Sequence, residues 1–146
     1  MWKVASKNEF IPLDAPVAGY ENGVPGIVGP SPLFIIRAKY KDGVHPGKWV
    51  LGNTAWIPWG GAEHICTDFD IYTGPLKWVA VSGKKFPPNM VEAGREDNGA
   101  PLYVARAKFE KGLFVGKAGR HLSKGCCIGY MGKEYELDTF EVLVWE

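Results

Sequence analysis

Two lysines and two glutamates occupy matching positions in the sequence. Lys48 and Lys117 each follow a glycine, and Glu21 and Glu96 each end a Gly-x-Glu stretch upstream of them. A carboxylate accepts hydrogen bonds from two adjacent hydroxyls, and an ammonium donates hydrogen bonds to oxygens. Together the two groups match the vicinal diol edge of a sugar. We therefore predict carbohydrate-binding roles for these four residues, and leave open whether each pair forms within one half of the chain or across the two halves.

A second pair of glutamates, Glu63 and Glu134, lies in turns rich in glycine and aromatic residues. We expect them to neutralise Arg37 and Arg106, because an arginine within an apolar strand needs a carboxylate if it is buried. A glycosidase or another sugar-acting enzyme stays open as an alternative, since glycosidases place two carboxyl groups on either side of one bond. Nothing in the sequence distinguishes a general acid from a nucleophile, so we expect a protein that is not an enzyme.

Phosphate and metal chemistry find little support in the sequence. Three residues separate Gly43 from Gly47, where a phosphate-binding loop needs four, and Trp49 replaces the serine or threonine that should follow Lys48. The cysteines and histidines lack the spacing typical of a metal site. They are Cys66, Cys126, Cys127, His45, His64 and His121. We therefore expect neither a cofactor nor a bound metal.

The chain contains one segment twice. Pro32–Lys48 returns as Pro101–Lys117, with the Arg-Ala-Lys triplet and the closing Gly-Lys in place. Weaker matches continue on both sides, and a glycine- and proline-rich piece at residues 22–29 is extra in the first copy, which predicts an inserted surface loop. Each copy alone is too small to bury a sufficient core. We predict two repeats, residues 1–74 and 75–146, packed about a pseudo-twofold axis as one globular unit.

Strands, rather than helices, should position these residues. Leu33–Tyr40 and Leu102–Phe109 are apolar runs rich in β-forming residues. The chain has 19 glycines, 11 prolines and 13% aromatic residues, a composition that favours short strands joined by tight turns. We predict an all-β fold in which the repeats form a compact, sandwich-like body or a compact, barrel-like pair of sheets.

Charge and length exclude several classes of partner. The 146 residues carry a net charge of +1, which gives no basic patch for nucleic acid or for an anionic membrane. No apolar run reaches the length of a membrane span, and the first ten residues lack the apolar region of a signal peptide. We expect a cytoplasmic protein, with unconventional release left open.

Four segments of the second copy resemble the DM9 repeat family, which includes mannose-specific invertebrate lectins and the N-terminal part of natterin-like proteins. These segments are Pro101–Ala107, Gly116-Lys117, Tyr130–Tyr135 and Phe140–Leu143. The resemblance extends over nearly the whole chain as two tandem repeats. It implies a β-rich body, often a homodimer, that binds mannose-type glycans on microbial or cell surfaces without a metal, and hence a role in innate defence or agglutination.

The resemblance also assigns roles to individual residues. It implies that the sugar-binding lysine falls on Lys48 and Lys117, and that the acidic position falls on Glu21 and Glu96. Glutamate here replaces the usual aspartate, so the sugar should sit differently from its place in other members. A protein-interaction scaffold, in which the repeats only build a stable body, is the remaining alternative to a lectin.

Overall fold

Fourteen β-strands and no helix make up the part of the chain that the computed structural model describes, residues 1–7 and 9–146. The strands of the first half are β1 (Trp2–Ser6), β2 (Gly19–Glu21), β3 (Ser31–Tyr40), β4 (Gly43–Val50), β5 (Ala55–Trp59), β6 (Ala62–Cys66) and β7 (Asp68–Tyr72). Those of the second half are β8 (Trp78–Ser82), β9 (Glu92–Arg95), β10 (Pro101–Phe109), β11 (Gly112–Ala118), β12 (Cys126–Tyr130), β13 (Lys133–Leu137) and β14 (Thr139–Leu143). The predicted all-β class is confirmed.

The strands form one continuous sheet that closes on itself. Strands β2, β11, β12, β13, β6, β5, β4 and β3 are hydrogen-bonded in this order, and β3 pairs back to β2. Of the two arrangements expected from the sequence, the barrel-like one is therefore nearer to the structure than the sandwich, because the sheet closes into a ring of eight strands rather than stacking as two separate layers. The remaining strands extend the sheet on either side, with β1 and β8 at its ends.

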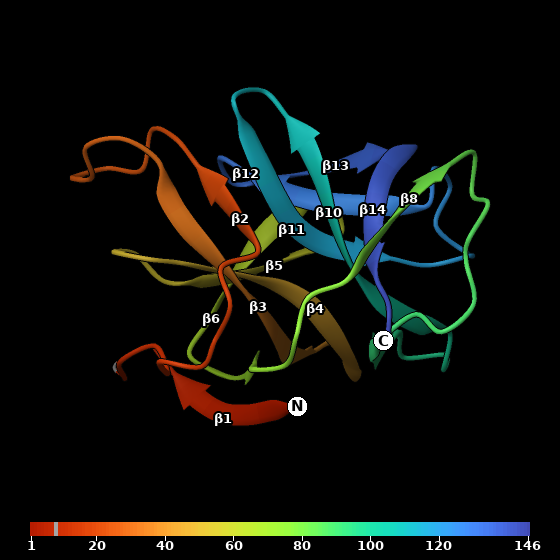
Figure 1. The fold of residues 1–146 in the computed structure, drawn as a ribbon, viewed down its shortest axis with the longest axis horizontal. Coiled ribbons are helices and arrows are strands. Elements are labelled where there is room, and N and C mark those ends of the chain that lie inside the picture. The colour runs from red at the N-terminus through yellow and green to blue at the C-terminus, as the bar shows by residue number, and fades with distance from the viewer. Residues whose placement is uncertain (8) are drawn as a thin grey trace.

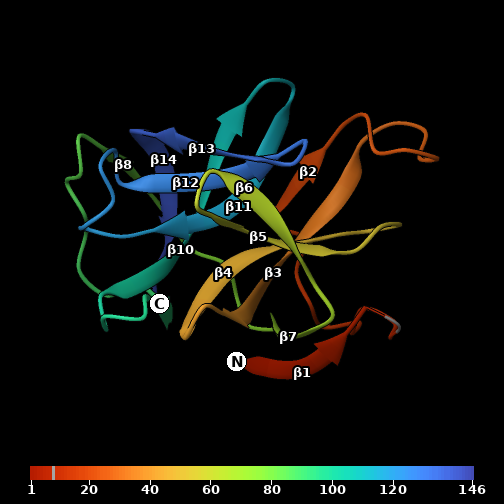
Figure 2. The same cartoon turned by 180° about the vertical axis from the view of Figure 1, so that it is seen from behind.

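Pairing between the two halves closes the ring. Strand β2 pairs with β11 through Tyr20 and Leu113, and β6 pairs with β13 through Ala62 and Lys133. Figures 1 and 2 show the two halves on different sides of the molecule, meeting along these pairings. The first half is coloured red to yellow-green and the second half green to blue. The division at residues 74 and 75 stays a prediction.

The core has one large and one smaller cluster of buried side chains. The large cluster joins residues of both halves, among them Leu33 and Ile35 of β3 with Val104 and Phe114 of β10 and β11. The smaller cluster draws on the first half alone and is centred on Trp49 and its neighbours. Because the large cluster takes apolar surface from both halves, removing either half would expose the core of the other.

The predicted inserted loop, residues 22–29, contains no strand and follows β2 directly. Val24 is buried in the large cluster, whereas Val28 is fully exposed. The amide of Asn22 donates a hydrogen bond of 2.6 Å to the Lys111 carbonyl of the second half. The loop is therefore anchored at its start and in its middle, close to the end of β2 that carries Glu21.

Candidate functional site

The two Gly-Lys pairs bring lysines into the interior of the fold. A Cβ atom at Gly47 would collide with the Trp56 carbonyl, and one at Gly116 would collide with the Cys127 carbonyl. Glycine therefore lets β4 approach β5 closely and β11 approach β12 closely. The lysine that follows each glycine is buried. Lys48 and Lys117 are each only 2% exposed. Lysine is almost never buried to this degree without a partner, so the groups around each ammonium are informative.

Three oxygens surround the ammonium of Lys48. Its Nζ donates hydrogen bonds to Glu21 Oε1 at 2.7 Å and to the Gly129 carbonyl at 2.8 Å. Glu63 Oε1 lies 3.0 Å away, at ion-pair distance but outside hydrogen-bond geometry. We call Lys48, Glu21, Glu63 and Gly129 the first lysine centre. The predicted pairing of Glu21 with Lys48 is thus formed in the structure.

The ammonium of Lys117 has fewer close neighbours. Its Nζ lies 3.2 Å from His45 Nδ1 and 3.9 Å from Glu134 Oε2. Glu96, the predicted partner, is instead held by His121, whose Nε2 lies 2.8 Å from Glu96 Oε2. The Glu96 charge nevertheless acts on Lys117, since it raises the pKa of this lysine against the lowering caused mainly by burial. We call Lys117, His45, Glu134, Glu96 and His121 the second lysine centre.

Each lysine centre contains a residue from the other half of the chain. His45 of the first half contacts Lys117, and Phe114 of the second half lies with its ring centroid 5.1 Å from Lys48 Nζ. His45 and Phe114 hold the same place in the duplicated segment. The centres therefore form across the two halves, a point that the sequence left open.

His45 is a neutral acceptor beside a cation. Burial, together with the positive charge of Lys117, lowers the pKa of His45 to about 4. The imidazole is therefore uncharged at neutral pH. A charged lysine can only donate, so Nδ1 accepts the hydrogen bond and the ring proton is carried on Nε2.

Glu63 and Glu134 do not neutralise the strand arginines, and this expectation was wrong. Arg37 pairs with Asp70 at 2.9 Å, and Arg106 pairs with Glu141 at 3.0 Å. The reason is strand register, because β3 places Arg37 directly opposite Asp70 of β7, and β10 places Arg106 opposite Glu141 of β14. The signal was present in the sequence, since Asp70 and Glu141 follow phenylalanines at matching positions of the two repeats.

The two glutamates instead join the lysines to the turns of the opposite half. Glu63 Oε2 accepts a hydrogen bond of 2.9 Å from the Gly132 amide, and Glu134 Oε1 accepts one of 3.0 Å from the Gly61 amide. Their other carboxylate oxygens face Lys48 and Lys117. Sequence reasoning missed this role because the contacts depend on how the two halves meet.

Metal and thiol chemistry have no visible site in residues 1–7 and 9–146. No group of three or more histidine, cysteine or acidic side chains there could hold a metal ion. Burial raises the pKa of the Cys66 and Cys127 thiols to about 12, so both stay protonated and unreactive. Within the same residues, no helix is long and apolar enough to cross a membrane.

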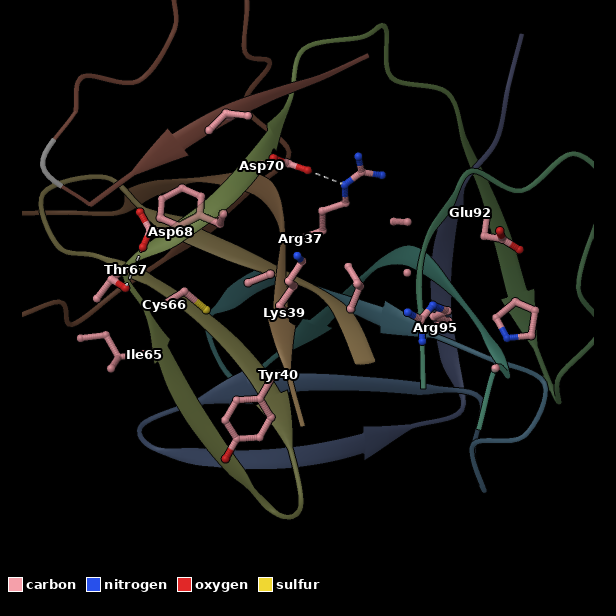
Figure 3. Close-up of a pocket in the computed structure, with 18 residues that line it drawn as sticks. Arg37, Lys39, Tyr40, Ile65, Cys66, Thr67, Asp68, Asp70, Glu92 and Arg95 are labelled. Atoms are coloured by element: carbon pink, nitrogen blue, oxygen red, sulfur yellow. Dashed lines mark hydrogen bonds and ion pairs between the residues drawn. The ribbon is translucent and has the colours of Figure 1, made fainter. Parts of the chain in front are cut away.

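A hollow of about 810 Å³ lies elsewhere, between β3, β7 and β9 (Figure 3). Arg37 and Asp70 face each other there, and Lys39 lies nearby. A smaller hollow of about 460 Å³ has the corresponding residues of the second half, namely Arg106, Lys108 and Glu141. No predicted sugar-binding residue is among the described residues that line either hollow. We favour the lysine centres, because their lysines are buried, whereas the side chains of Arg37 and Asp70 are each about one-third exposed.

Comparison with known proteins supports both the fold and the family. The crystal structure of the nematode sperm cell motility protein MFP2B is similar, with a TM-score of 0.68 and 15% sequence identity. The match covers 99% of this chain but 45% of MFP2B, so the chain spans less than half of that protein, and at this identity the likeness concerns the fold alone. A comparison with curated proteins gives no match. The model of the DM9 repeat matches residues 28–137, most of the chain, and the protein therefore belongs to the DM9 repeat family.

Proposed function

We propose that the protein is a lectin, which binds carbohydrate at its lysine centres without changing it chemically. The observation that carries the proposal is that both halves bring a buried lysine near the glutamate of the Gly-x-Glu stretch. Lys48 Nζ lies 2.7 Å from Glu21 Oε1, and the charge of Glu96 acts on Lys117. An ammonium and a carboxylate placed in this way supply the donors and acceptors that a vicinal diol needs.

Mannose and mannose-rich glycans are the ligands we propose, with agglutination or innate defence as the role. Membership in the DM9 repeat family supports this choice, because the family includes mannose-specific invertebrate lectins. Individual sugar sites are weak, so joining sites within a chain, or in a homodimer, would raise the avidity for a glycan-covered microbial or cell surface.

We also propose that the two halves are repeats related by a pseudo-twofold axis. Reciprocal contacts support this relation. The Glu63 amide donates to the Gly132 carbonyl and the Glu134 amide donates to the Gly61 carbonyl, each at 3.0 Å. The matching strands β6 and β13 thus exchange equivalent hydrogen bonds, as two copies facing each other would.

The arrangement of the carboxylates favours binding over hydrolysis. Glu21 and Glu63 both face one ammonium, with Oε1 atoms 2.7 and 3.0 Å from Lys48 Nζ. A glycosidase instead directs two carboxyl groups at opposite sides of a glycosidic bond and keeps one of them protonated. Incubation with mannan oligosaccharides should therefore release no reducing sugar.

Isothermal titration calorimetry with methyl α-mannoside and with mannan tests the proposal. The double variant Glu21→Gln/Glu96→Gln removes both carboxylates at nearly constant shape and should weaken binding at least tenfold. The matched control is Lys39→Ala/Lys108→Ala, which removes two exposed lysines outside the centres and should bind as the wild type does. Undiminished binding by the glutamate variant would show that the site is assigned wrongly. Absence of binding by the wild type to any sugar would reject the lectin.

A further inference from the structure

We infer that the two lysine centres are not equivalent: the second centre receives the sugar, whereas the first is a closed ion-pair latch that holds the fold together. This inference rests on the proposed lectin function and specifies which site carries it. The two centres derive from matching residues, so the difference between them lies in the contacts around each ammonium.

The ammonium of Lys48 is more completely surrounded by acceptors than that of Lys117. It donates two hydrogen bonds, at 2.7 and 2.8 Å, and a third oxygen, Glu63 Oε1, lies 3.0 Å away at ion-pair distance. Two of these oxygens belong to carboxylates, from Glu21 and Glu63. A sugar hydroxyl could enter only by displacing one of them, which would leave a buried charge less well compensated. The Phe114 ring also lies over this ammonium, with its centroid 5.1 Å from Nζ.

Lys117 keeps hydrogen-bonding capacity for a ligand. Its one close acceptor among the described residues is His45 Nδ1 at 3.2 Å, and Glu134 is 3.9 Å away. The carbonyl that completes the first centre belongs to Gly129, and the residue at the matching position of the first repeat is Pro58. No hydrogen bond joins Lys117 to Pro58 within residues 1–7 and 9–146. An oxygen from a sugar would therefore complete the coordination of this ammonium rather than compete for it.

His121 contacts the carboxylate of Glu96, the acidic residue of the second lysine centre. Its Nε2 lies 2.8 Å from Glu96 Oε2, and its side chain is 33% exposed. It belongs to the connection between β11 and β12, residues 119–125, which is longer than the connection between β4 and β5, residues 51–54. The imidazole is the more exposed partner, since the Glu96 side chain is 18% exposed, so a ligand can reach the carboxylate by displacing His121 toward solvent.

The ligand that fits this centre carries two adjacent hydroxyls. One hydroxyl oxygen accepts a hydrogen bond from Lys117 Nζ, and the hydroxyl protons donate to the Glu96 carboxylate in place of His121. His45, uncharged at neutral pH, fixes the ammonium from the interior side without competing for Glu96. His121 thus acts as a gate whose removal should increase affinity for the diol.

Calorimetric stoichiometry and a crystal soaked with methyl α-mannoside test the inference in the intact chain. We expect one sugar per chain, with density between Glu96 and Lys117 and His121 turned away. Glu96→Gln should lower affinity at least tenfold, and His121→Ala should raise it severalfold. The matched control is Arg120→Ala, which removes the neighbouring exposed side chain and should leave affinity unchanged.

The failure of this inference is distinct from failure of the lectin proposal. Two sugars per chain, or a single sugar at Glu21 and Lys48, would overturn the inference and leave the lectin intact. A wild-type chain that binds no sugar would reject both. Stability gives a second measurement that needs no ligand, since a latch requires that Glu21→Gln lower the thermal unfolding midpoint more than Glu96→Gln does. Equal shifts would overturn the difference between the centres.

Discussion

Glu63 is joined to Gly132 of the other half by two hydrogen bonds. The Glu63 amide donates to the Gly132 carbonyl at 3.0 Å, and the Gly132 amide donates to Glu63 Oε2 at 2.9 Å. The other carboxylate oxygen lies 3.0 Å from Lys48 Nζ. One side chain therefore connects a turn of the second half to a buried cation of the first, and makes the seam between halves continuous with the lysine centre.

Glu63→Ala should destabilise the fold strongly. Removing one partner of a buried ion pair leaves a charge uncompensated and costs about 3–5 kcal/mol. Urea unfolding followed by tryptophan fluorescence measures this loss. Asp14→Ala is the control, because the Lys3–Asp14 pair is exposed and its loss should not shift the midpoint. A Glu63→Ala midpoint as high as that of the control would contradict the importance of this contact.

His45 should make stability depend on pH. Its pKa is lowered from 6.5 to about 4 on folding, so the folded state binds fewer protons than the unfolded state between these values. The contribution is complete above pH 6.5 and is lost as pH falls toward 4, with an upper limit of about 3 kcal/mol. The charged groups that act on His45 are Lys117, which lowers its pKa, and Glu96 and Asp97, which raise it.

His45→Gln isolates this effect, because glutamine keeps a hydrogen-bond acceptor for Lys117 but does not titrate. The urea unfolding midpoint of each protein is measured at steps between pH 4 and pH 7. The two proteins are then compared by how steeply the midpoint falls as the pH is lowered. We expect the wild type to lose stability faster than the variant as pH falls. Parallel curves would mean that His45 keeps an ordinary pKa in the folded protein.

The duplicated segment predicted some features of the site well and others poorly. Residue type and spacing identified Glu21 and Lys48 as candidates, but whether they pair within one half was left open, and the structure shows that they do. The contact of His45 with Lys117 could not be predicted, since it depends on how β4 meets β11 across the seam. The all-β class was likewise readable from composition, whereas ring closure depends on single pairings such as Tyr20 with Leu113.

Gly47→Ala and Gly116→Ala should each disturb a lysine centre without touching its polar groups. In each variant the new methyl group would collide with a backbone carbonyl, of Trp56 or of Cys127, and overpacking of this kind costs about 1–3 kcal/mol. Thermal melts measure the loss. The control is Gly26→Asn, at a loop position with open space and a φ of 81° that asparagine tolerates. Unchanged midpoints for both alanine variants would show that the strands can separate freely.

Arg106 should contribute more to stability than its counterpart Arg37. The two guanidinium groups have similar surroundings, since Arg37 lies 4.3 Å from the Trp2 ring centroid and Arg106 lies 4.2 Å from that of Trp78. Each Nε donates to a carboxylate, but Arg106 alone also donates from Nη1 to the Ala18 carbonyl of the other half, at 3.0 Å.

Lysine at either position can keep the ion pair but cannot donate to two partners in the same fork geometry. Arg106→Lys should therefore cost about 1.5 kcal/mol more than Arg37→Lys, the contribution of one hydrogen bond from a charged donor. Urea unfolding of the two single variants measures the difference, with each variant serving as the control for the other. Equal losses would show that the contact with the Ala18 carbonyl adds nothing to stability.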